Sequence, residues 1–188
     1  MDSLSMWSQQ PSMMVPVSLR VFGVSAVTAA AIIAPAAFAL EQQPVLPVAL
    51  AAEAALKALQ TCQAQNYAVA VTVVNREGNT ITLLRHQDAG VHTATNSFNK
   101  AFTTVSFGRA YGLTSTRAII AATKPGRGIG DYPLLASPMP GLSYSVGGVA
   151  LQSGGVVIGA IGVSGTPSGD RDEQCALAGI EAIKPKLR

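Results

Sequence analysis

The sequence has few of the residues from which metal centres and nucleic-acid interfaces are built. It contains two cysteines and two histidines in 188 residues, and Cys62 and Cys175 lie too far apart for a structural zinc site of the usual spacing. Its lysines and arginines are scattered, without interleaved aromatic residues, so the net charge of +3 gives no support to nucleic-acid binding. We therefore expect neither a structural zinc site nor a nucleic-acid partner.

Motifs of the common catalytic folds are also missing. No Gly-Lys-Ser or Gly-Lys-Thr triplet occurs, which excludes a phosphate-binding P-loop. The glycines between Gly126 and Gly130 lack the spacing of a dinucleotide-binding loop, and no apolar strand precedes them. Ser164 follows Gly162, but Thr166 stands where a nucleophile elbow needs glycine. No catalytic triad can be assembled, so the sequence leaves open whether the protein is an enzyme.

The first 39 residues have the pattern of an export signal. Arg20 is the only basic residue before Lys57, and residues 21–39 carry no charge and are mostly alanine, valine and isoleucine. Small residues at Ala37 and Ala39 predict cleavage by a signal peptidase before Leu40. The sequence therefore predicts a cleaved signal peptide at 1–39, one domain at 40–188, and a periplasmic or secreted location.

An uncleaved membrane anchor is the alternative, because the apolar run is near the lower length limit for a membrane span. Pro35 and the cleavage-like Ala37-Phe38-Ala39 favour removal of the segment. We therefore expect no stable membrane span after signal cleavage.

Two cysteines in an exported chain favour a disulfide bond. Cys62 ends a series of apolar residues at helical spacing, and Cys175 begins another in the last helix of the chain. If both helices pack on the same face of a sheet, the two thiols meet. We predict a Cys62–Cys175 bridge, with two buried free thiols as the alternative.

The mature chain alternates helical and strand patterns. The predicted elements are a helix at 42–65, strands at 67–74 and 80–85 joined by a turn at Gly78, helices at 91–105 and 117–123, an irregular Pro- and Gly-rich segment at 124–143, strands at 144–152 and 156–164, and a C-terminal helix that begins near Asp170. This order predicts an α+β fold in which helices pack on an antiparallel sheet.

A polar segment between the first hairpin and the following helix holds both histidines of the chain, His86 and His92. Neutral imidazole is a good ligand of haem iron, so this segment is a candidate haem site in which a histidine would ligate the iron. Arg85 and Lys100 could then pair with the haem propionates. The alternative is that all four side chains are ordinary surface or capping residues.

Over almost the whole mature chain, from Pro47 to Ile183, the sequence resembles the GlcG/HbpS haem-binding family. The blocks that carry the resemblance are Ala55–Cys62, Tyr67–Val71, Arg85 with Asp88–Thr93, Lys100–Thr103, Gly147–Val149, Gly159–Gly165, and Asp172–Ile180. Two positions depart from the family pattern. Asn75 stands where Asp is usual, and Ala150 stands where Pro is common.

The resemblance implies a profilin-like fold, with a five-stranded antiparallel sheet between helices, and assembly into ring-based homo-oligomers. It also implies haem binding, and in some members slow haem breakdown or iron binding linked to the sensing of oxidative stress. The axial ligand is His in some members and Thr in others. We therefore take His92 as the first candidate ligand of the iron, with Thr93 and His86 as the alternatives.

Two other functions remain open at this point. The first is a small-molecule enzyme or sensor of the same fold that binds no haem and has its site in the Lys124–Ser143 segment. The second is a structural oligomer in which that segment forms a subunit interface.

Overall fold

The computed structural model describes residues 42–122 and 140–187, which belong to one compact unit. The predicted signal peptide and most of the Lys124–Ser143 segment lie outside the described residues. The elements are α1 (Val48–Gln63), β1 (Ala70–Asn75), β2 (Thr80–Arg85), α2 (Thr93–Tyr111), α3 (Thr116–Ala122), β3 (Gly148–Ser153), β4 (Val156–Ser164), α4 (Gly169–Ile183) and the 3-10 turn η1 (Lys184–Lys186).

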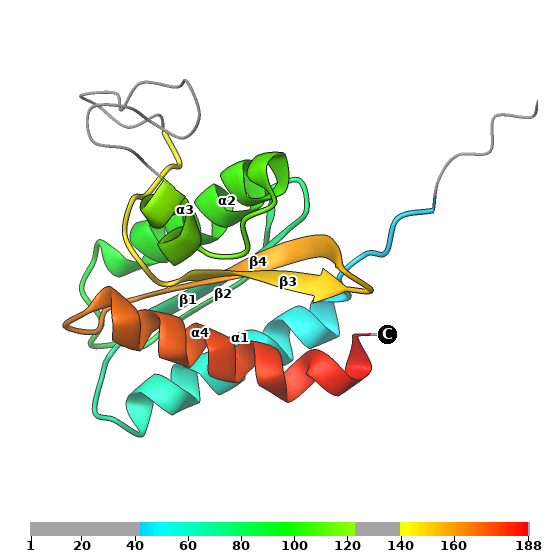
Figure 1. Ribbon diagram of the computed structural model, residues 1–188. Coiled ribbons are helices and arrows are strands. Elements are labelled where there is room, and N and C mark those ends of the chain that lie inside the picture. Colours follow the sequence, from blue (N-terminus) through cyan, green and yellow to red (C-terminus); the bar gives the residue numbers. More distant parts are fainter. Residues whose placement is uncertain (1–41, 123–139, 188) are drawn as a thin grey trace, which may run out of the picture. The chain divides into compact units, whose positions relative to one another are not determined.

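The four strands form one antiparallel sheet in the order β2-β1-β4-β3 (Figure 1). Strand β1 is central, and five of its six residues, Ala70 to Val74, are buried. Ala70 pairs with Arg85 on one side and with Ser164 on the other. Strands β2 and β4 therefore end on the same side of the sheet, level with the first residue of β1. The loops that follow these two strands start side by side.

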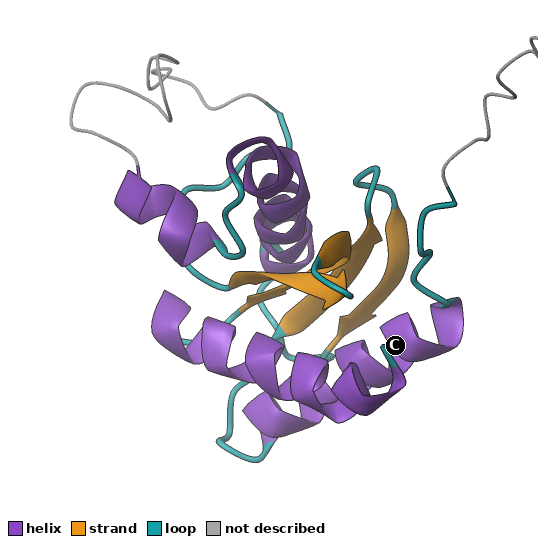
Figure 2. Ribbon diagram, turned by 45° about the vertical axis from the view of Figure 1, so that its right-hand side comes forward, coloured by secondary structure: helices purple, strands orange, loops and turns teal. Residues whose placement is uncertain are grey.

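Helices cover both faces of the sheet. Helices α1 and α4 pack together on one face, and α2 with α3 lies on the opposite face (Figures 1 and 2). The predicted α+β fold, with an antiparallel sheet between helices, is confirmed. None of the helices in the described part of the chain is long and apolar enough to cross a membrane.

Within residues 42–122 and 140–187 the sheet has four strands, one fewer than the profilin-like prediction. Beyond the edge strand β3, the described chain makes only an isolated bridge between Ser115 and Val149 and a hydrogen bond from Ala150 N–H to Thr114 O at 2.8 Å. The backbone enters α3 at Thr116, so pairing along this edge stops after one bridge.

The same edge explains why alanine suits position 150. Proline, common in the family at this position, has no N–H to donate to Thr114 O. Asn75, the other departure from the family pattern, closes the first hairpin. Its side-chain oxygen accepts the N–H groups of Glu77 and Asn79 at 3.1 and 2.8 Å, as a carboxylate would.

Helix α2 lies unusually close to the sheet because glycines face it. A Cβ atom on Gly162 would lie 2.1 Å from the Ser97 carbonyl oxygen, and one on Gly148 would lie 2.4 Å from that of Lys100. The residues that α2 buries are consequently mostly small or polar. They include Ser97, Lys100 and Ala101, with Val105 as the largest apolar one, whereas Phe98 is only half-buried.

In the layer on the opposite face of the sheet, the predicted disulfide joins α1 to α4. Cys62 of α1 and Cys175 of α4 are bridged, with their Cα atoms 5.7 Å apart and both side chains fully buried. The bridge lies within the main apolar core, to which α1 contributes mostly alanines. Small residues there let the two helices pack closely enough for the sulfurs to meet.

Removing the bridge should destabilise the domain substantially. We expect Cys62→Ala/Cys175→Ala to lower the free energy of unfolding by about 4 kcal/mol, because a long loop is no longer closed in the unfolded chain. Urea denaturation of the mature protein measures the change. The single Cys62→Ala variant is the control and should match the double variant, and a double variant as stable as the parent would contradict the prediction.

Candidate functional site

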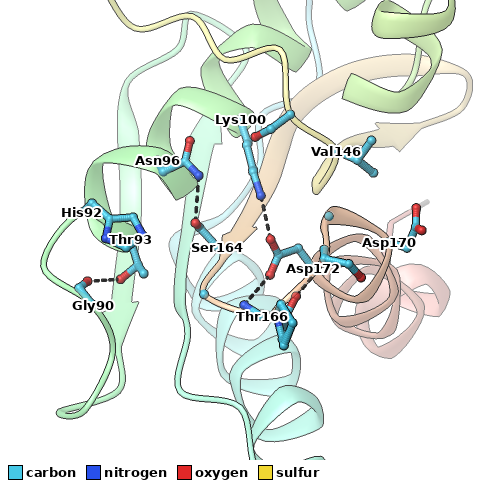
Figure 3. A pocket seen from close by; sticks show the side chains of 15 residues that line it. Gly90, His92, Thr93, Asn96, Lys100, Val146, Ser164, Thr166, Asp170 and Asp172 are labelled. Atoms are coloured by element: carbon cyan, nitrogen blue, oxygen red, sulfur yellow. Dashed lines mark hydrogen bonds and ion pairs between the residues drawn. The ribbon is translucent and has the colours of Figure 1, made fainter.

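A cleft of about 420 Å³ opens at the end of the sheet where β2 and β4 stop (Figure 3). One wall is the loop before α2 together with the first turns of that helix. The other is the loop after β4 and the first turn of α4, with the segment before β3 closing the top. The lining residues are Gly90, His92, Thr93, Asn96, Lys100, Ser145, Val146, residues 164–170, and Asp172.

His92 lies at one end of this cleft, immediately before α2 (Figure 3). Its side chain is exposed, and neither ring nitrogen has a hydrogen-bond partner among the described residues. Gly90 makes room for the ring, since a Cβ atom there would lie 2.9 Å from His92 Cε1. Both ring nitrogens of His92 are therefore available for binding at this end of the cleft.

The other three residues of the predicted segment near His92 have different surroundings. His86 does not line the cleft, and its Nδ1 accepts the Asp88 N–H at 3.2 Å. Thr93 does line the cleft but is 1% exposed, and its hydroxyl donates to Gly90 O at 2.7 Å. Arg85 is exposed and donates to Ala89 O, next to the His92 end of the cleft. No carboxylate within the described residues pairs with Arg85.

Lys100 is not the free surface cation that the sequence suggested. It is 2% exposed, and its Nζ lies 2.7 Å from Asp172 Oδ2 and 3.0 Å from Val163 O. Asp172 is 3% exposed, and its other oxygen accepts the Thr166 N–H at 3.1 Å. This pair joins α2 to α4 across the end of β4 and forms the floor of the cleft (Figure 3). A Lys100 held in this way is poorly placed to meet a haem propionate.

A chain of polar side chains continues the floor along α2. Asn96 Nδ2 donates to Ser164 Oγ at 2.9 Å, and Asn96 Oδ1 accepts the Ser143 hydroxyl at 3.3 Å. Ser143 and Ser145 share a further bond of 3.0 Å. Sequence reasoning missed this chain, since its members come from three distant segments and no local motif marks them.

The first turn of α4 is fixed from the outside by Arg117 of α3. The guanidinium lies 2.6 Å from both Asp170 and Glu173, and hydrogen bonding to Asp170 and then Glu173 raises the pKa of Arg117. The spacing of Asp170 and Glu173 resembles that of a capping box, but α4 begins after Ser168 without a side-chain cap. The two carboxylates bind Arg117 instead.

No group of three or more His, Cys, Asp or Glu side chains in the described ranges could hold a metal ion. The donors that the cleft offers are one free imidazole, several hydroxyl and amide groups, and a neutralised ion pair. Fold and site thus define a class of protein: an α+β domain with an open cleft of mixed polar and apolar lining and a free histidine at one end.

Comparison with known proteins identifies the family. Residues 46–181, most of the chain, match the family described as haem degrading protein HbpS-like. The chain belongs to this HbpS-like family, as its sequence blocks predicted.

Individual relatives agree with this assignment. A double mutant of HbpS from Streptomyces reticuli is 29% identical, with a TM-score of 0.63 over 92% of this chain and 99% of that one. The crystallised PduOC:heme complex is 26% identical, with a TM-score of 0.65 over 74% of this chain and 96% of that one. An uncharacterised 15.0 kDa protein from the dhaT-dhaS intergenic region of Citrobacter freundii is 33% identical over 129 residues, which are 66% of this chain and 84% of that protein.

Breaking the floor pair from one side should be costly. Lys100→Met leaves Asp172 buried without its cation, and we expect a loss of about 3–5 kcal/mol in the free energy of unfolding. Urea denaturation provides the measurement. Lys100→Met/Asp172→Asn is the matched control and should recover a large part of the loss, because no unpaired charge remains buried. Equal stability of the two variants would show that the ion pair does not matter to the fold.

Proposed function

We propose that this chain is an exported haem-binding protein in which His92 ligates the iron. The observation that carries the proposal is the uncommitted imidazole of His92 at the mouth of the cleft. Neutral imidazole is a common axial ligand of haem iron, and a nitrogen without another partner is available to it. Family membership and the similarity to a protein crystallised with haem support the same proposal.

The surroundings of His92 suit a porphyrin that stays partly exposed. Val91, beside His92, is 91% exposed and offers an apolar contact next to the ligand. Arg85 lies by the same end of the cleft, without a carboxylate partner among the described residues, and can pair with a propionate. Lys100 is bound to Asp172, so we assign propionate recognition to Arg85 in its place.

Thr93 and His86 fit less well as iron ligands. Thr93 is buried and holds the loop through Gly90, and His86 belongs to the turn at Asp88, outside the cleft. Haem bound at His92 would supply a redox-active iron. Sequestration, sensing and slow degradation of haem all begin with this binding step.

The proposal predicts a saturable Soret change when haem is titrated into mature protein, residues 40–188. His92→Ala should abolish saturation or weaken binding at least tenfold, because the iron loses its ligand. His86→Ala is the matched control and should bind as the parent does. Arg85→Ala should weaken binding of haem but not of haem dimethyl ester, which has no propionate charge.

Binding that survives in the His92 variant would remove this ligand assignment while keeping haem. The absence of saturable binding by the parent protein would reject the haem function altogether. The polar floor of the cleft would then favour the second candidate, a small-molecule enzyme or sensor without haem. The site first considered for that candidate, Lys124–Ser143, lies mostly outside the described residues.

Export and assembly belong to the same proposal. A buried disulfide fits an oxidising compartment, and the leader-like residues 1–39 supply the route. Native mass spectrometry of protein recovered from outside the cytoplasm should find subunits that begin at Leu40, contain no free thiol and form a homo-oligomer. Subunits that retain the leader would contradict export with cleavage, and a monomer would contradict assembly.

A further inference from the structure

Two buried hydrogen-bond donors on the floor of the cleft are incompletely used. Ser164 is 3% exposed, and its Oγ accepts a bond from Asn96, but no described group accepts the hydroxyl hydrogen of Ser164. Lys100 donates to Val163 O and to Asp172, which occupies two of the three N–H groups of an ammonium. Every buried polar side-chain atom of the described residues has at least one hydrogen-bond partner. The hydrogens that Lys100 and Ser164 have left over are therefore spare donor capacity at the cleft, where an acceptor can bind.

The two donors lie next to each other. Lys100 Nζ is 3.0 Å from the carbonyl oxygen of Val163, the residue before Ser164, and both side chains line the cleft (Figure 3). Gly147 is needed for this arrangement, since a Cβ atom there would lie 2.9 Å from Lys100 Nζ and 2.8 Å from Asp172 Cβ. Both groups therefore offer a donor to the same cleft.

The charge of the floor selects the kind of acceptor. Asp172 lies 2.7 Å from Lys100 Nζ and neutralises it, so the pair offers no net positive charge to an incoming anion. A second carboxylate would also be repelled by Asp172 at close range in a poorly solvated site. A neutral oxygen gains the two hydrogen bonds without this repulsion.

We propose that Lys100 and Ser164 form a binding subsite for an uncharged oxygen acceptor, such as the carbonyl oxygen of an amide. The subsite is separate from His92 and Arg85 and does not require haem. It would hold a small neutral ligand, or the neutral carbonyl group of a larger one that fills the cleft.

Titration of haem-free mature protein with acetamide tests the proposal, with acetate as the charged probe of equal size. Backbone amide signals of residues 163–166 are followed by NMR. Acetamide should give saturable shifts with a dissociation constant on the order of millimolar, as expected for so few atoms. Acetate should bind at least threefold more weakly.

Ser164→Ala should weaken acetamide binding roughly three- to tenfold, the usual effect of one lost hydrogen bond. Ser106→Ala is the matched control, because Ser106 is exposed on α2 and does not line the cleft. It should bind acetamide as the parent does.

The subsite is rejected if acetamide gives no saturable shift, or if the two variants behave alike. Binding of acetate as tight as that of acetamide overturns the assignment to an uncharged ligand. These results are independent of the Soret titration. Haem binding can fail while the subsite holds, and the reverse can also occur.

Discussion

The close approach of α2 to the sheet at Gly148 and Gly162 is the constraint on which the rest of the structure depends. With a side chain at either glycine, a Cβ atom would lie within 2.4 Å of a backbone oxygen of α2. The helix would have to move away from β3 and β4. Lys100 could then no longer reach Val163 and Asp172, and the floor of the cleft would lose the contact that joins its two walls.

This constraint divides the molecule into two layers of different chemistry. On the face covered by α1 and α4, alanines, branched apolar strand residues and the Cys62–Cys175 bridge form a conventional core. On the α2 face, a small apolar cluster around Ala101 and Val105 lies beside short polar contacts, such as the 2.7 Å bond between Thr72 and Ser97. Hydrogen bonds need well-defined donor–acceptor distances and angles, so these polar contacts depend on the close approach of α2 to the sheet.

The cleft lies where the α2 layer ends. The end of the cleft near His92 differs in chemistry from its floor. At one end an exposed imidazole, an exposed valine and an arginine without a carboxylate partner among the described residues offer ligation, apolar contact and charge. On the floor, the lysine is neutralised and buried with its aspartate. The proposed haem site and the proposed acceptor subsite follow from this separation of free and satisfied charge.

Much of the fold was predictable from local patterns. The hairpin turn at Gly78 has φ of 85°, the strand at 80–85 has the predicted bounds, and the cysteines meet because both lie on buried stripes of adjacent helices. The buried face of α2 was predictable only in part. Ala101 and Val105, at helical spacing, are buried as expected, but only the glycines of β3 and β4 explain why serine, threonine and lysine are buried beside them.

The site shows the same division. The sequence by itself determined the order of the elements, the disulfide, the family and the short segment that contains His92, because these depend on local spacing and on residue type. Only the tertiary structure decided which histidine is free, that Asp172 is the partner of Lys100, and that Ser164 faces the cleft beside them. Those assignments depend on distances between residues far apart in the chain, which are set by how closely α2 packs on the sheet.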